Sequence, residues 1–293
     1  MGPVVVEQFA RVRGAARQYV VSSLGGELDA GRIRNGEGPG WFGPQSAAWK
    51  IHQDPCLLIG GIAALFYQVL HPLAMAGVAE HSSYETDPFG RLHRTSMFLA
   101  EVVYGDSATA ERNVETVRRI HERVRGLAPD GRPYSASDPD LLRYVHITEV
   151  AGFLRSYQRY GKQKLEAGEA DAYVREMSVV AEKLGAVDVP KTVAGLEECL
   201  VRYRPYLALG EQGLRAIKFL RNPPGGVATK LGYRIVLDGA AALIDEPEAS
   251  MLGLGRERRR GGVLASGTVA AGLLREILGE SPVVSAAKQR VGL

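Results

Sequence analysis

Apolar residues recur at helical spacing along nearly the whole chain, and almost no segment alternates with period two. The pairs Asp54–Pro55, Asp87–Pro88 and Asp138–Pro139 mark helix starts, because aspartate caps a helix and proline suits its first turn. The expected helices cover about residues 88–105, 107–126, 138–160, 167–185, 191–207, 209–220, 225–245 and 262–278. The pattern predicts an all-α globular fold of roughly ten helices.

The segment Asn222–Gly226, which reads NPPGG, is the one candidate domain boundary. A chain of 293 residues is long enough for one large core or for two domains. Beyond this segment the composition turns to alanine, glycine and leucine, so we expect residues 225–293 to form helices that complete a single domain over residues 1–293. The Arg256–Arg260 cluster is interpreted as a solvated loop or helix end, with an anion site as the alternative.

Composition excludes several classes of protein. A net charge of +3 is too small to indicate nucleic-acid binding, and Cys56 and Cys199 are typical of buried thiols in a reducing compartment. The N-terminus lacks a secretory signal, which favours a cytoplasmic protein, at most peripheral to a membrane. Its apolar residues from Val5 to Val20 predict an amphipathic surface helix, or an arm packed on a partner as in a homodimer.

The apolar run from Cys56 to Ala79 is long enough to span a bilayer. Gln68, His71 and Pro72 interrupt it, and a lipid environment would leave the polar side chains of Gln68 and His71 without partners. We therefore predict no membrane span, and instead a buried central helix that bends at the His71–Pro72 step.

Titratable groups gather around this run, since four of the six histidines lie between His52 and His93. Imidazole and guanidinium groups set into an apolar wall are what a buried metal or haem site requires. Arg91, Thr95 and Phe98 share one face of the helix that follows. A buried Arg91 needs an anionic partner, and an ordinary salt bridge to Glu80, Glu85 or Asp87 is the alternative to a functional role.

Two further histidines lie on later helices. His121 follows Val114 and Val117 at helical spacing, so it is either hydrogen-bonded in the core or bound to a metal. His146 shares a face with Glu149, which makes this pair the rival metal site. The ExxH spacing of di-iron bundles does not occur, because the order is HxxE and there is no second copy. Phosphate-loop, Rossmann, HExxH and GxSxG motifs are missing from the sequence.

A family resemblance rests on four strings in order: GGIAALFYQVLHPLAMAGVAEHS, PFGRLHRT, VRRIHERVRG and YSASDPDLLRYVH. Together they resemble the MpaB and rubber-oxygenase (latex clearing protein) catalytic-domain family over about residues 45–220. The resemblance implies an all-helical domain that holds one b-type haem noncovalently and uses dioxygen for oxidation. Rubber-cleaving members cut the double bonds of polyisoprene, and fungal members are implicated in cleaving a terpenoid side chain.

The resemblance also assigns roles to residues. The family's proximal haem histidine stands in an H-x-x-V-R string, which implies His121 as the iron ligand and Arg125 as a nearby cofactor contact. Arg91 and Thr95 match the distal arginine and threonine, so Arg91 is expected to contact a haem propionate or bound dioxygen. Arg94 stands where rubber-cleaving members have a lysine. Arg91, Thr95 and Arg94 are therefore the predicted catalytic residues.

The resemblance and the residues together predict a haem b-dependent oxygenase that acts with dioxygen on an apolar, isoprenoid or aromatic small molecule. The distal glutamate of rubber-cleaving members has no counterpart near Met75, which argues against polyisoprene as substrate. His146 and His81 are the alternative cofactor-binding residues. The expected apolar pocket residues are Leu65, Phe66, Leu70, Leu73 and Phe98. A haem-binding or sensing protein without turnover, and a metal-free helical scaffold, are the alternative functions.

Overall fold

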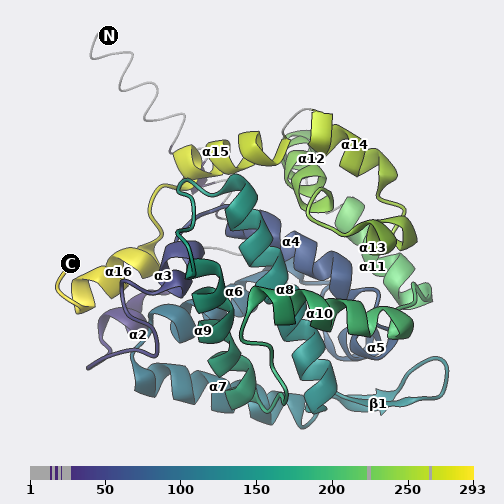
Figure 1. Ribbon diagram of the computed structural model, residues 1–293, viewed down its shortest axis with the longest axis horizontal. Helices are drawn as coiled ribbons and strands as arrows, with labels where there is room; N and C mark the ends of the chain where they lie inside the picture. The colour runs from purple at the N-terminus through teal and green to yellow at the C-terminus, as the bar shows by residue number, and fades with distance from the viewer. Residues whose placement is uncertain (1–13, 15–16, 19–20, 22–27, 223–225, 264–265) are drawn as a thin grey trace.

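The computed structural model describes residues 14, 17–18, 21, 28–222, 226–263 and 266–293. Most of the N-terminal segment for which an amphipathic helix was predicted lies outside these residues. The described part of the chain contains fifteen α-helices and one small hairpin of two strands, so the predicted all-α fold is confirmed. In Figure 1, α8 runs through the middle of the molecule and α11–α14 lie together at the upper right.

The first half of the described chain contains α2 (Gly31–Arg34), α3 (Ala47–His52), α4 (Leu57–Gln68), α5 (Pro72–His81), α6 (Pro88–Tyr104), α7 (Ser107–His121), β1 (Arg125–Leu127), β2 (Pro133–Ser135) and α8 (Pro139–Tyr160). The second half contains α9 (Glu169–Leu184), α10 (Val193–Tyr203), the 3-10 helix η1 (Arg204–Tyr206), α11 (Glu211–Arg221), α12 (Val227–Ala241), α13 (Glu246–Met251), α14 (Gly255–Val263), α15 (Ser266–Leu278) and α16 (Pro282–Arg290).

Two of the three aspartate–proline pairs begin helices as predicted. The Asp87 side chain accepts a hydrogen bond from the Gly90 backbone N–H at the start of α6, and Asp138 caps α8 in a similar way. Asp54 differs, because α4 begins only at Leu57. The Asp54 carboxylate instead accepts hydrogen bonds from the Arg275 guanidinium of α15, at 2.9–3.1 Å.

The packing of α4 against α8 forms the centre of the fold and explains the paired glycines of α4. A Cβ atom at Gly60 would lie 2.6 Å from the backbone oxygen of Gly152 on α8, a distance that no side chain tolerates. The two backbones therefore approach each other as closely as they do only because both positions are glycine. A Cβ atom at Gly61 would meet nothing closer than 3.7 Å.

The chain breaks at the predicted His71–Pro72 step. Pro72 is the first residue of α5, and the His71 side chain caps this helix by accepting from the Ala74 backbone N–H at 3.4 Å. The axes of α4 and α5 differ by 109°. In the part of the chain that the structure describes, no single helix is long and apolar enough to cross a membrane, and only this bent pair passes on length and composition.

The C-terminal helices share the main apolar core with the earlier part of the chain. The buried cluster that contains Ile59 of α4, and Leu70 just after this helix, also contains Leu237, Ile244 and Val284. Polar contacts also cross the NPPGG segment, of which residues 223–225 lie outside the described chain. In one of them the Arg155 guanidinium on α8 pairs with Asp245, just before α13, at 3.1 Å.

The helix predicted to reach Gly126 ends five residues earlier, at His121, and this prediction is wrong at its C-terminal end. Arg125–Leu127 instead forms β1, which pairs antiparallel with β2 and aligns Gly126 with Tyr134. Strands of three residues are too short to show a period-two pattern in the sequence. Five further helices, α2, α3, α13, α14 and α16, were also not predicted.

Candidate functional site

The six histidines divide into two groups according to their hydrogen bonds. The imidazoles of His52, His71 and His81 each have a partner, namely Tyr173, the backbone of Ala74 and Tyr134 respectively. These three are satisfied structural histidines. The ring nitrogens of His93, His121 and His146 make no hydrogen bond with any residue that the structure describes. The three unpaired imidazoles are therefore the candidate ligands.

His121 is the last residue of α7. Its Nδ1 atom is buried without a partner, and burial lowers the pKa of the ring. His93 on α6 also has a buried, unpaired Nδ1 atom, and sequence reasoning did not single it out. His146, in the middle of α8, is more strongly affected, because burial lowers its pKa to about 4. Both His121 and His146 are thus neutral at pH 7, the form of imidazole that binds a metal.

Arg91 lies in the first half of α6, and its side chain is partly exposed. The protein around it still desolvates the guanidinium and so lowers its pKa. The Tyr84 phenol and the Glu149 carboxyl group, whose ionised forms are negative, act in the opposite direction on this pKa. Arg91 forms no ion pair within 4 Å in the described structure. Its charge is therefore balanced at longer range only, by Glu149 from α8.

The acids that were the ordinary salt-bridge candidates for Arg91 are engaged elsewhere. Glu80 accepts a hydrogen bond from the Tyr134 hydroxyl. Glu85 accepts one from the neighbouring Tyr84 hydroxyl at 2.8 Å. Asp87 caps α6 and lies 3.4 Å from the Arg94 guanidinium. The structure therefore does not contain the salt bridge that would make Arg91 a purely structural residue.

Glu149 lies on α8, between the fully buried Thr148 and the nearly fully buried Val150. Burial raises the pKa of its carboxyl group to about 7, although a hydrogen bond from Gln68 and the charge of Arg91 both lower it. The sequence indicated only that Glu149 shares a face with His146. Its electrostatic interaction with Arg91, 58 positions earlier in the chain, depends on tertiary structure.

Arg91, His146 and Glu149 are each partly accessible to a water-sized sphere, yet burial has the largest influence on the pKa of each. Protein therefore surrounds most of each group, while part of its surface stays accessible. Gln68 of α4 is also partly accessible; its amide donates to the Thr148 hydroxyl at 3.3 Å and lowers the pKa of the neighbouring Glu149. We call Arg91, His146, Glu149 and Gln68 the interior polar cluster.

The other predicted site residues do not belong to this cluster. Thr95 is exposed, and its hydroxyl donates to the Arg91 backbone oxygen at 3.1 Å. The Arg94 guanidinium is 63% exposed and pairs with Asp87. Arg125 is exposed on β1, and His81 is exposed at the end of α5.

Part of the expected apolar lining is core instead. Phe66 and Leu70 are fully buried within the main cluster, so they have no surface to offer a ligand. Leu65, Leu73 and Phe98 are partly accessible. In the described part of the chain, no three His, Cys, Asp or Glu side chains are close enough to hold a metal ion.

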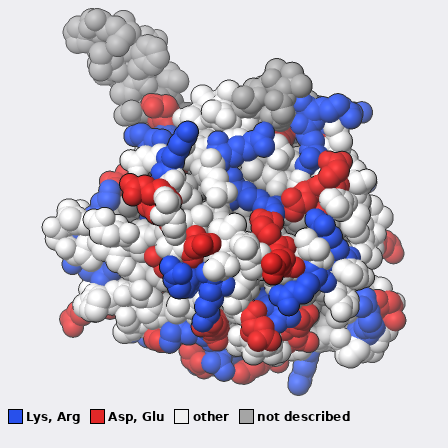
Figure 2. Space-filling view, viewed as in Figure 1, with Lys and Arg blue, Asp and Glu red and all other residues white. Residues whose placement is uncertain are grey.

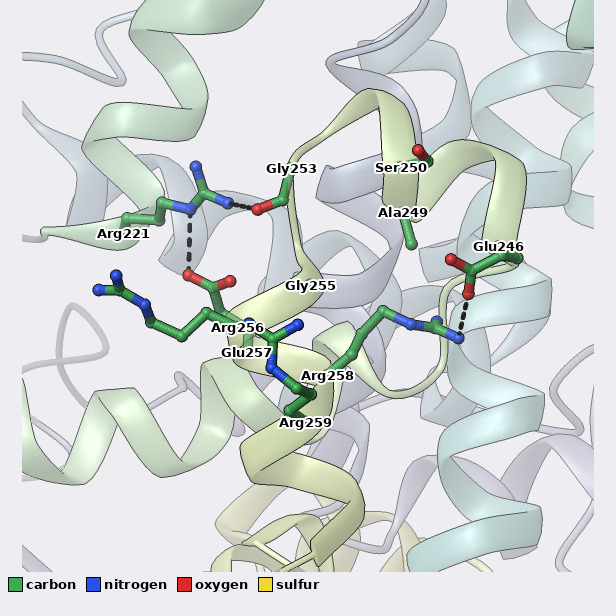
Figure 3. Close-up of a pocket in the computed structure, with 10 residues that line it drawn as sticks. All are labelled: Arg221, Glu246, Ala249, Ser250, Gly253, Gly255, Arg256, Glu257, Arg258 and Arg259. Carbon is green, nitrogen blue, oxygen red and sulfur yellow. Dashed lines mark hydrogen bonds and ion pairs between the residues drawn. The ribbon is translucent and has the colours of Figure 1, made fainter.

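A separate hollow of about 840 Å³ is lined by residues of α11, α13 and α14 and contains most of the predicted arginine cluster. Figure 3 shows two of its arginines engaged internally: Arg221 pairs with Glu257 at 3.3 Å, and Arg258 pairs with Glu246 at 2.9 Å. Arg256 and Arg259 are exposed on α14. Arg256 and Arg259 are thus solvated, as predicted for this cluster, whereas Arg258 is half-buried and Glu257 is buried. Figure 2 shows acidic and basic side chains interleaved over the described residues of one face, with no broad region of one sign.

The fold and the interior polar cluster define an all-helical protein with desolvated titratable groups, among them the imidazole of His146, and such groups are typical of enzyme active sites. The chain belongs to the family described as ER-bound oxygenase mpaB/B'/rubber oxygenase, catalytic domain, whose model matches residues 49–275. The match extends well beyond residue 220, where the resemblance in the sequence ended, and includes α12 and α15. Comparisons with curated proteins and with solved structures gave no match.

Proposed function

We propose that this oxygenase-family chain uses haem b and dioxygen to oxidise a hydrophobic small molecule of the isoprenoid or aromatic class. The observation that carries the proposal is the presence of neutral imidazoles without partners within the family's domain. A satisfied core histidine would use its nitrogens as His52 does, in a 3.0 Å hydrogen bond to Tyr173.

The residues present fit a haem. His121 would hold the iron, because it stands in the HERVR string and neither of its ring nitrogens is used. His146 is the alternative ligand, with an equally unused ring on α8. When bound, the haem would supply the activation of dioxygen.

The chain's own groups would contribute charge and a dry environment. Arg91 supplies a positive charge that no nearby carboxylate neutralises, and it can therefore attract a haem propionate or a substrate oxygen. Thr95 holds the α6 backbone at Arg91 through its 3.1 Å hydrogen bond. Leu65, Leu73 and Phe98 offer partly accessible apolar surface, which favours an apolar substrate.

A haemin titration followed by the Soret absorption of the bound haem tests the proposal. The wild-type protein should bind one haem per chain. His121→Ala should lose tight binding, whereas His81→Ala should keep it, because His81 is exposed and already bonded to Tyr134. Arg118→Ala, an exposed change one turn earlier on α7, controls for damage to the helix.

Alanine variants of the candidate histidines distinguish the possible ligands. If His121→Ala keeps the wild-type spectrum and His146→Ala loses it, then α8 supplies the ligand. If the wild-type protein shows no saturable haem binding, the proposed cofactor is wrong. Circular dichroism of each variant should show unchanged helical content, which separates loss of the ligand from loss of the fold.

A further inference from the structure

The hollow beside α11, α13 and α14 lies apart from the candidate site and carries an excess of positive charge. Four arginines and two glutamates line it, namely Arg221, Arg256, Arg258, Arg259, Glu246 and Glu257. Among the described residues of its lining, Ala249 has the one apolar side chain. A volume of about 840 Å³ is large enough for a small organic molecule. The hollow is thus a polar space with two more positive than negative side chains.

Two of the four arginines build its walls. Arg221 of α11 pairs with Glu257 of α14 at 3.3 Å and donates to the Gly253 backbone oxygen at 2.7 Å. Arg258 of α14 pairs with Glu246 of α13 at 2.9 Å (Figure 3). A carboxylate therefore neutralises the charge of each of these arginines, and the two ion pairs hold α14 to α11 and α13.

The other two arginines, Arg256 and Arg259, have no such partner. Neither guanidinium makes a hydrogen bond or an ion pair with the part of the chain that the structure describes, and Figure 3 draws none for them. They stand three positions apart on α14, so their side chains are neighbours on one side of the helix. Both are exposed, so a ligand in the hollow can reach them.

Their position on α14 adds to the positive charge. The Nη1 atom of Arg259 would lie 3.5 Å from a Cβ atom at Gly255, the first residue of the helix, so this guanidinium lies over the first turn. Arg256 belongs to the same turn. Two like charges at this spacing repel each other, and the positive end of the helix dipole repels both. An anion bound between them would remove this repulsion.

We propose that the hollow binds the phosphate group of a polar phosphate ester, held by Arg256 and Arg259 together. The planar guanidinium fork matches phosphate oxygens, and two unneutralised positive charges match a group that carries about two negative charges near pH 7. The Ser250 hydroxyl of α13 lines the same hollow and can donate a further hydrogen bond. The polar lining suits an organic part such as glycerol or a sugar, in contrast to the apolar substrate of the proposed function.

Calorimetric titration of the haem-free chain with glycerol 3-phosphate tests this inference independently of the proposed cofactor. The wild-type protein should bind one molecule per chain, and binding should weaken as salt increases. Arg256→Gln combined with Arg259→Gln should weaken binding roughly tenfold or more. Arg118→Gln combined with Arg202→Gln removes the same charge from exposed positions of α7 and α10, and should leave the affinity unchanged. Glycerol without phosphate should not bind.

A phospholipid headgroup offers the same phosphate chemistry, and sedimentation with phosphatidylcholine vesicles that contain phosphatidic acid distinguishes this source from a soluble ester. Binding of either probe that the Arg256→Gln, Arg259→Gln variant loses supports the site, and the probe that binds identifies the source. If neither probe binds, or if this variant binds both as the wild-type protein does, the inference is overturned.

Thermal unfolding without phosphate separates loss of the site from loss of the fold. The Arg256→Gln, Arg259→Gln variant should melt at the wild-type temperature or above it, because the repulsion between the two guanidinium groups is removed. A lower melting temperature would contradict the repulsion on which the inference rests.

Discussion

Replacing Glu149 with glutamine should change how the stability of the protein depends on pH. Burial raises the pKa of this carboxyl group from an ordinary value of 4.5 to about 7 in the folded state. The folded state therefore binds the proton more tightly than the unfolded chain does. The stability that Glu149 contributes is fully present below about pH 4.5 and is lost as the pH rises to about 7.

The size of this effect follows from the shift in pKa. Each unit of pKa corresponds to about 1.4 kcal/mol, which gives about 3 kcal/mol for the full shift. Because the side chain is partly accessible, screening reduces the expected effect to about 2 kcal/mol. Glutamine cannot ionise, so Glu149→Gln should gain about this much stability relative to the wild-type protein between pH 5 and pH 8.

Urea unfolding monitored by circular dichroism at several pH values measures this difference. Glu115→Gln, a change at an exposed position of α7, should give a difference in unfolding free energy that is flat with pH. The reasoning is refuted if the difference between Glu149→Gln and the wild-type protein is also flat from pH 5 to pH 8.

Three substitutions and one matched control test the packing of the fold by urea unfolding. Gly60→Ala should lower the unfolding free energy by about 2 kcal/mol, because its Cβ would lie 2.6 Å from a backbone oxygen of α8. Gly61→Ala is the matched control and should be neutral or stabilising by up to about 1 kcal/mol; equal losses for both would contradict the close approach of the helices. Arg155→Ala should cost about 2 kcal/mol, because it removes the ion pairs of Arg155 with Asp245 and Glu197 although the Tyr67 hydroxyl still donates to Asp245, and an unchanged midpoint would show these ion pairs to be dispensable. Leu70→Ala should cost about 3 kcal/mol because the side chain is fully buried, and a loss below about 1 kcal/mol would place Leu70 outside the core.

The helices were predictable where local signals set them. The Asp87 and Asp138 caps begin α6 and α8 because the capping hydrogen bonds are made within three residues of sequence. The end of α7 was not predictable, because the Ala136 backbone N–H, twelve residues later, donates to Val124 and holds the chain in the hairpin. The need for glycine at position 60 was also not predictable, because the Gly152 backbone that it contacts belongs to another helix.

The candidate site was predictable only in part. Arg91 is partly accessible, whereas Thr95, which was predicted to share its face of α6, is exposed. The HERVR string pointed to His121, whose Nδ1 atom is buried without a partner. The sequence could not show that Glu80, Glu85 and Asp87 have other partners, because these contacts involve side-chain positions in space. For the same reason it could not identify Glu149 as the counter-charge of Arg91.

Dioxygen uptake by the purified protein tests the central claim most directly. The measurement compares haem-free and haem-loaded protein against a panel of apolar isoprenoid and aromatic compounds, with isotopically labelled dioxygen and mass analysis of the products. We predict uptake that depends on both haem and an apolar compound, with label from dioxygen in the product. Equal uptake by the haem-free protein, or product oxygen that derives from water, would contradict a haem-dependent oxygenase.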